Sequence, residues 1–149
     1  MHEWLVFLEG PAGTPFENGI FVLDVLLPEN YPFVPPRITF STPIFHCNVS
    51  VNGSICLDAL QHQWSPALVV AHCLHLIAKM LQNPDSDNAL RPAIAELYFG
   101  NRQDALDTRY VDQARAATRA EASKSLEELR ALYGIHDRED IIESRGNTC

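Results

Sequence analysis

The pattern of side chains along the first part of the chain predicts a small β-sheet. Segment 4–9, WLVFLE, separates into two alternating sets of side chains, which predicts a strand that begins almost at the first residue. The apolar run Ile20–Leu27, in which Asp24 is the only charge, predicts a second strand, and Arg37–Phe40 predicts a third. Because turns rather than helices separate these runs, we expect an antiparallel meander.

The connections between these runs are rich in residues that interrupt regular structure. Gly10–Gly19 is dense in Gly, Pro and Asn and is typical of a hairpin connection. Pro28–Pro36 contains four prolines, which have no backbone N–H to donate to a neighbouring strand. We therefore expect this second connection to be a loop.

Beyond Trp64 the apolar positions adopt the spacing of a helix. Ser65 followed by Pro66 is typical of an N-cap and a first helical turn, and good helix formers continue to Gln82. Polar side chains at helical spacing predict a solvent-facing stripe of His72, His75, Lys79 and Gln82. The apolar side chains expected to be buried are Leu68, Ala71, Cys73, Leu74, Ile77, Ala78 and Leu81.

The second half of the chain is predicted to be helical. After the polar loop Asn83–Pro92, a short helix is expected from Pro92 through Phe99, ending at Gly100, and a further helical region from about Arg102. Leucines at every third position then predict an apolar edge that can dock elsewhere, Leu126, Leu129 and Leu132. The polar, mixed-charge segment that follows is expected to fray.

Composition narrows the classes of partner. A chain of 149 residues suits one domain, and 46% hydrophobic residues are enough for a core. The formal net charge of −8 argues against nucleic-acid or membrane partners, because such partners select concentrated Lys and Arg. The apolar run Trp4–Leu8 is too short for a signal peptide or a membrane span. We expect a soluble protein of the cytoplasm, the nucleus or both.

The stretch Ile44–Leu60 carries the most suggestive chemistry. It is a polar loop between hydrophobic blocks, with Cys56 at its far edge. A free thiol with a pKa near ~8.5 is a few per cent thiolate at neutral pH, enough to attack an activated acyl group. Asn48 supplies an amide N–H that can stabilise an oxyanion. The alternative is that Cys56 is a small buried hydrophobe and that Asn48 closes its own turn.

Other groups of reactive side chains give weaker evidence of a functional site. The cysteines lack both the paired Cys-x-x-Cys spacing of zinc sites and a disulfide framework, so we expect no metal and four free thiols. His46 is a candidate general base for a cysteine hydrolase, although a loop histidine more often hydrogen-bonds its own backbone. The cluster Tyr31, Pro32 and Phe33 is either core or, with the loop Trp64–Ala67, an exposed patch for a partner.

Six motifs occur between Trp4 and Ala122 in an order and at spacings that one family shares. They are GPAGTPFENGIF, YPFVPPRITF, IFHCN, NGSICLDAL, WSPAL and LQNPDSDNAL. In these motifs the chain resembles the ubiquitin-conjugating enzymes. The resemblance implies an α+β, UBC-like fold, in which an antiparallel meander of about four strands packs with a long central helix and C-terminal helices. It implies a core domain at 1–122, without the family's N-terminal helix, and a C-terminal helical extension and flexible tail at 123–149.

The resemblance also implies a thioester carrier. Cys56 would accept ubiquitin from the activating enzyme and pass it to a substrate lysine or to a ligase. The implied partners are therefore ubiquitin, the activating enzyme, RING, U-box or other ligases, and substrate proteins. No cofactor is implied, because only the activating enzyme uses ATP. The family's ligase-binding surface corresponds to Phe33, Pro66 and Ala67.

Further roles transfer to residues that match the family's motifs. Asn48 matches an asparagine assigned to oxyanion stabilisation or loop support, and the preceding His46 is taken as structural. Asp58 matches an acidic position associated with placing the attacking lysine. Asn88 and Leu90 match the gate loop that faces the active site.

Three features depart from the family's pattern. The family's His-Pro-Asn is His-Cys-Asn here, so Cys47 replaces a proline that fixes the turn. Asn88 stands where an aspartate is frequent, and the N-terminal helix has no counterpart. We hypothesise that the edge formed by Leu126, Leu129 and Leu132 covers part of the surface that this helix would cover. The rival hypothesis is a catalytically impaired interaction or regulatory module with the same fold.

Overall fold

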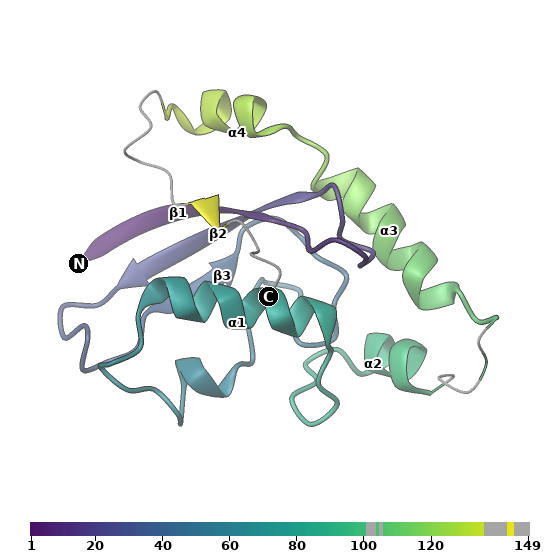
Figure 1. Cartoon of the computed structure of the whole chain (residues 1–149), viewed down its shortest axis with the longest axis horizontal. Coiled ribbons are helices and arrows are strands. Elements are labelled where there is room, and N and C mark those ends of the chain that lie inside the picture. Colours follow the sequence, from purple (N-terminus) through teal and green to yellow (C-terminus); the bar gives the residue numbers. More distant parts are fainter. Residues whose placement is uncertain (101–103, 105, 136–142, 145–149) are drawn as a thin grey trace.

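The computed structural model describes residues 1–100, 104, 106–135 and 143–144 (Figure 1). It is built from four strands, one short 3-10 helix and four α-helices within these residues. In chain order they are β1 (His2–Glu9), β2 (Ile20–Leu27), β3 (Arg37–Phe40), η1 (Asp58–Leu60), α1 (Val70–Gln82), α2 (Pro92–Phe99), α3 (Arg109–Glu121), α4 (Leu126–Tyr133) and β4 (Glu143–Ser144).

The sheet has the strand order β3-β2-β1-β4. β1 pairs antiparallel with β2, and β2 pairs antiparallel with β3, so the predicted hairpin and meander are confirmed. β4 departs from the meander because it pairs in parallel with β1. A frayed tail was expected beyond Gly134, but Glu143–Ser144 forms this edge strand, since main-chain pairing does not require an apolar sequence. The rest of that tail lies outside the described residues.

The two faces of the sheet are covered by different helices. On the inner face, buried side chains of the strands, such as Val6 and Leu23, belong to one core with Leu74 and Ile77 of α1. On the outer face, Phe7 and Val22 form a second cluster with a leucine of α4. Figure 1 shows the sheet lying between α1 and α4. The first core extends under the loops that carry the candidate site.

The apolar edge of α4 packs on the outer face of the sheet, with one exception. Leu129 is 5% exposed and Leu126 is half-buried against the outer face, whereas Leu132 is 64% exposed. Each step of three residues turns about 60° backwards around a helix, so Leu132 points about 120° away from Leu126. The expected contact of Leu132 is therefore wrong.

α1 keeps its predicted stripe but starts later than predicted. The four polar side chains of the stripe are exposed and the helix ends at Gln82, as expected. Ala71, expected to be buried, is exposed. Ser65 is not the N-cap, because its hydroxyl accepts the Ala67 N–H at 3.3 Å and closes a separate turn. The helix begins only after Val69, whose backbone is extended at φ −112° and ψ 156°.

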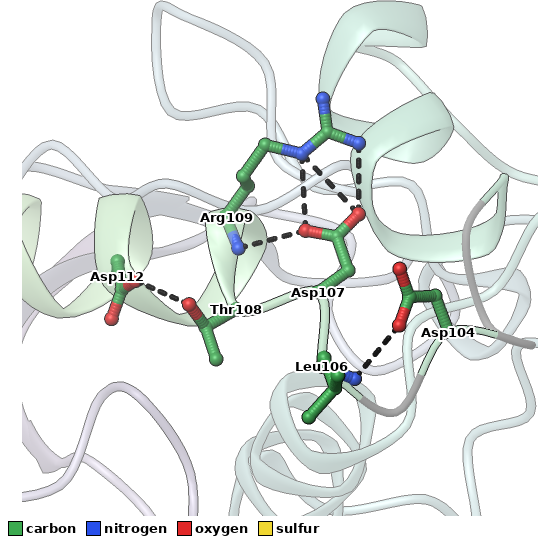
Figure 2. Close-up of polar contacts among 6 residues, drawn as sticks. All are labelled: Asp104, Leu106, Asp107, Thr108, Arg109 and Asp112. Atoms are coloured by element: carbon green, nitrogen blue, oxygen red, sulfur yellow. Dashed lines mark hydrogen bonds and ion pairs between the residues drawn. The ribbon is translucent and has the colours of Figure 1, made fainter.

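α2 occupies the predicted range, whereas α3 begins later than the predicted start near Arg102. Figure 2 shows the reason. Asp104 accepts the N–H of Leu106, and Asp107 accepts the N–H of Arg109, both at 3.0 Å. Such local bonds from Asp side chains offer the backbone turns in place of a helix. Asp107 also forms an ion pair with the Arg109 guanidinium at 2.8 Å.

No helix within the described residues is both long and apolar enough to cross a membrane.

Candidate active site

Cys56 lies on a narrow loop that is fixed to the sheet. Its N–H donates to the carbonyl of Asn48 at 3.2 Å, and a bridge joins Val49 to Ile55 on the two sides of the loop. Gly53 turns the loop with a φ of +88°, and a Cβ there would meet the carbonyl oxygen of Phe40 at 2.0 Å. The loop is therefore held close to β3, and the Cys56 side chain is half-buried at its end.

The surroundings of Cys56 disfavour its thiolate. Burial raises the pKa of this thiol, and the negative charges of Asp58 and Asp85 raise it further. The thiolate fraction at neutral pH is therefore lower than that of the free cysteine assumed from the sequence. A thiol with a raised pKa is also a slower leaving group in exchange reactions.

Asn48 connects the Cys56 loop to the segment 85–88. The side chain has no exposed surface. Its amide donates to the carbonyls of Asp85 at 2.7 Å and Asn88 at 2.9 Å, and its oxygen accepts the N–H of Asp85 at 2.9 Å. Both amide hydrogens are thereby engaged. This geometry favours the loop-support role over the oxyanion role that the resemblance left open.

Asn88 and Asp85 complete a polar chain that begins at the thiol. The Cys56 Sγ donates to the Asn88 Oδ1 at 3.4 Å, and the Asn88 Nδ2 donates to the Asp85 Oδ2 at 2.7 Å. The Asp85 Oδ1 accepts the N–H of Asp87 at 2.9 Å. The sequence prediction missed Asp85, although an Asp that can bond the N–H two positions ahead is a recognisable turn signal.

Cys47 holds the segment Leu90–Arg91 through its main chain. Its carbonyl accepts the N–H of Leu90 at 2.8 Å and of Arg91 at 3.1 Å. The thiol is 1% exposed and donates to the Asn48 Oδ1 at 3.6 Å. Hydrogen bonds therefore fix this turn where the family has a proline. The Leu90 side chain is 42% exposed.

His46 is a structural residue in this geometry. It has no exposed surface, its Nε2 donates to the carbonyl of Met80 at 3.0 Å, and its Nδ1 accepts the N–H of Asn48 at 3.1 Å. Burial lowers its pKa to about 4. Because both ring nitrogens are occupied by main-chain partners, the geometry speaks against the hydrolase in which His46 acts as a general base.

Asp58 stands at the exposed start of η1, two positions after the thiol. Its main-chain carbonyl accepts the N–H groups of Gln61 and Gln63 at 3.0 and 2.9 Å. These bonds fix the turn that follows Cys56. The carboxylate remains in solvent and acts on the thiol through its charge.

Two distant loops meet to form an exposed apolar patch. The Trp64 Nε1 donates to the carbonyl of Pro32 at 2.9 Å, and the rings of Tyr31 and Trp64 lie 6.2 Å apart. This contact answers the question left open by the sequence, since Tyr31 and Trp64 pack on the core while Phe33 is 79% exposed. We name the exposed members the loop patch: Phe33, Pro66 and Ala67.

The cysteines of the described residues, Cys47, Cys56 and Cys73, are free thiols as predicted. Cys149 lies outside the described residues. Of the three, Cys56 alone is not buried.

Comparisons with known proteins agree with the motifs. A family model described as ubiquitin-conjugating enzyme matches residues 1–114. The chain is 44% identical over 102 residues to a relative named ubiquitin-conjugating enzyme E2 31 from Arabidopsis thaliana, over 68% of this chain and 66% of the relative. The chain thus spans just under two thirds of the length of this relative.

Two solved structures share the fold. A ubiquitin-conjugating enzyme domain from Toxoplasma gondii has a TM-score of 0.70 and 38% identity, over 78% of this chain and 77% of that one. A Plasmodium yoelii protein, also described as a ubiquitin-conjugating enzyme, has a TM-score of 0.74 and 38% identity, over 83% of this chain and 77% of that one. The expected UBC-like fold is confirmed.

Proposed function

Because the chain belongs to the ubiquitin-conjugating enzyme family, we propose that it carries ubiquitin as a thioester on Cys56 and passes it to a substrate lysine or a ligase. The observation that carries this proposal is the hydrogen-bonded setting of the thiol. Cys56 is half-buried, bonds to Asn88, and lies on a loop that Asn48 connects to the segment 85–88. A reacting sulfur needs this kind of fixed surrounding, because small displacements of reacting groups slow catalysis strongly.

Both chemical steps conserve the acyl group. In charging, the Cys56 sulfur attacks the thioester of the activating enzyme, forms a new C–S bond, and that enzyme's thiol leaves with the Cys56 proton. In transfer, a lysine amine attacks the carbonyl, a C–N bond forms, and the C–S bond breaks. The amine proton goes to the Cys56 sulfur, which returns as a thiol. ATP is needed only by the activating enzyme, so this chain requires no cofactor.

The surrounding residues support these steps in different ways. We assign Asn48 to loop support, because its amide hydrogens bond main-chain carbonyls. We assign Asp58 to placing the attacking lysine, because its exposed carboxylate lies close enough to act on the pKa of Cys56. Leu90 contributes an exposed apolar side chain at the gate. The loop patch is proposed to receive the ligase, since it presents an exposed aromatic ring beside small apolar residues.

The decisive experiment is a charging assay. Incubation with ubiquitin, activating enzyme and ATP is expected to add one ubiquitin, and reductant is expected to remove it. Cys56→Ser should give a reductant-resistant oxyester or no adduct. Cys73→Ala, which alters a buried thiol on α1, should keep the reductant-sensitive adduct.

Circular dichroism of each variant verifies folding before the assay. Folded wild-type protein that binds ubiquitin or a ligase but forms no adduct would refute the proposal. It would instead support the non-catalytic interaction module.

A further inference from the structure

The Asp85 carboxylate is connected to the Cys56 sulfur through one intervening side chain, that of Asn88. Its Oδ2 accepts a hydrogen bond from the Asn88 amide at 2.7 Å, and the oxygen of that amide accepts from the Cys56 thiol at 3.4 Å. The Asp85 main chain is fixed by Asn48 through two further bonds. The carboxylate is therefore held in place independently of the bond that it makes to Asn88.

The chemistry of this carboxylate decides which end of the Asn88 amide faces the sulfur. A carboxamide has a donor end and an acceptor end of nearly equal shape, whereas an ionised carboxylate only accepts. Asp85 must therefore face the NH₂ group, which directs the oxygen of Asn88 toward Cys56. The negative charge of Asp85 also strengthens that oxygen as an acceptor, because linked hydrogen bonds polarise one another.

We propose that Asp85 is a positioning residue that orients the Asn88 carboxamide, so that its oxygen accepts a hydrogen bond from the N–H of the lysine amine that attacks the thioester. This inference rests on the proposed function. Once Cys56 carries an acyl group, the thiol proton is gone and the Asn88 Oδ1 is free to accept another hydrogen bond. The N–H of a neutral amine can donate that bond, while the proton that the amine loses still goes to the Cys56 sulfur.

Replacement of Asp85 by Asn reverses the orientation. The Asp85 Oδ1 accepts the N–H of Asp87, so an asparagine would keep its oxygen there and place its NH₂ group where Oδ2 was. Two NH₂ groups cannot face each other, so Asn88 turns its oxygen inward and its NH₂ group toward the sulfur. Asp85→Asn is nearly isosteric and leaves the main-chain bonds to Asn48 in place.

The first test measures single-turnover discharge from charged protein. Asp85→Asn is expected to slow discharge to free lysine about tenfold, as for the loss of one hydrogen bond in the transition state. Discharge to the small thiol 2-mercaptoethanol should not slow, because an attacking thiolate has no hydrogen to donate. Asp87→Asn is the matched control, since the Asp87 carboxylate accepts no hydrogen bond within the described residues. It should stay within about twofold of wild type for both nucleophiles.

The exchange variant Asp85→Asn with Asn88→Asp tests rescue. Its asparagine at position 85 donates to the new carboxylate, whose second oxygen faces the sulfur. Lysine discharge should return to within about twofold of wild type. Wild-type lysine discharge in Asp85→Asn, equal slowing for both nucleophiles, or no rescue would each overturn the proposal.

A second readout uses uncharged protein and so does not depend on the proposed function. The pH profile of iodoacetamide alkylation is followed by mass spectrometry at the peptide that contains Cys56. Asp85→Asn should shift this profile to lower pH, because a negative charge is lost and an NH₂ group now faces the thiolate. Asp87→Asn should shift it less. An unshifted profile in Asp85→Asn overturns the inference. A shifted profile in a protein that takes up no ubiquitin leaves the orientation in place and refutes the carrier function instead.

Discussion

Two side chains without exposed surface, His46 and Asn48, hold the loop that presents Cys56. His46 joins this loop to the end of α1 through Met80, and Asn48 joins it to Asp85 and Asn88. Every one of these bonds has a main-chain partner. Loss of His46 therefore leaves buried main-chain groups without a partner, which costs about 1–3 kcal/mol for each group, and loss of Asn48 does the same to partly buried groups at a lower cost.

The buried His46 predicts a pH dependence of stability. Its pKa is lowered from 6.5 to about 4 by burial, so the unfolded chain binds the additional proton first as the pH falls. The His46 contribution is complete above pH ~6.5 and is lost between pH ~6.5 and ~4, up to ~3 kcal/mol in the free energy of unfolding. Urea unfolding at pH 7.5, 5.5 and 4.5 measures this loss.

The control for this prediction is a histidine on the exposed stripe of α1. His75→Gln should keep the wild-type pH dependence, whereas His46→Gln should weaken it in the interval between pH 4 and 6.5. Equal pH dependence in His46→Gln and wild type would show that this histidine does not titrate as its burial requires.

Among single residues, the structure brings Cys56, Asn48 and Asn88 together, with the charge of Asp58 close enough to act on the thiol. The motifs contain Asp85 but gave it no role. A motif marks residue types at fixed spacing along the chain, and the hydrogen bond between Asp85 and Asn88 depends on how the loop is folded. The same limit applies to Asn48. Its residue type allows two roles, and our proposal of loop support comes from the main-chain partners of its amide.

At the scale of elements, α4 is a defined helix with its own start and end. Ser125 caps its first turn, with the hydroxyl accepting from the N–H of Glu128 at 3.2 Å and the Glu128 carboxylate accepting from the Ser125 N–H at 2.7 Å. These bonds lower the pKa of Glu128. Gly134 ends the helix with a φ of 68°. The helix thus buries Leu129 on the outer face of the sheet rather than extending as a loose tail.

Two leucines of α4 give a matched test of this docking. Leu129→Ala should lower the free energy of unfolding by about 2–4 kcal/mol, because it removes a buried side chain beside Phe7 and Val22. Leu132→Ala should change it by less than about 0.5 kcal/mol, because that side chain is 64% exposed. Chemical denaturation of both variants makes the comparison.

Deletion of residues 123–149 extends this test to the whole element. It should lower the melting temperature, because it exposes the apolar outer face. An unchanged melting temperature, together with equal effects of Leu129→Ala and Leu132→Ala, would show that α4 does not stabilise the sheet.

At the scale of the whole molecule, the candidate active site and the loop patch are separate assemblies on one scaffold. The site joins the loop before η1 to the segment between α1 and α2, whereas the patch joins the loop before β3 to the loop before α1. Both assemblies border the first hydrophobic core. A substitution on the exposed part of the patch can therefore be made without changing a contact of the thiol.

This separation predicts a selective effect on ligase-dependent transfer. Phe33→Ala should reduce ligase-stimulated discharge at least tenfold, because exposed aromatic anchors carry much of the binding energy of interfaces. Discharge without a ligase should remain unchanged. Leu106→Ala, which alters another exposed apolar side chain, should retain ligase stimulation. A parallel measurement with a panel of RING and U-box ligases is required. Full stimulation of Phe33→Ala by every ligase that acts on wild type would refute the proposal that the loop patch binds the ligase.

The sequence by itself determined the elements whose signals are local. Alternation placed β1, an apolar run placed β2, and β3 was found at the expected range Arg37–Phe40. Helical spacing placed the polar stripe of α1, and Pro92 and Gly100 marked the two ends of α2. Local signals failed at the starts of α1 and α3, where the side chains of Ser65, Asp104 and Asp107 bond nearby main-chain groups and form turns. Residue propensity alone does not decide between a helix start and a separate turn at these positions, because Ser and Asp are common in both.

Only the tertiary structure decided which distant segments meet. The bonds of Cys56 to Asn88 and of Asn48 to Asp85 and Asn88 join residues 32, 37 and 40 positions apart. The docking of Leu129 on Phe7 and Val22 likewise joins α4 to the first two strands of the chain. Periodicity reports which face of an element is apolar, but not which partner covers it. The geometry around the thiol therefore follows from packing between segments.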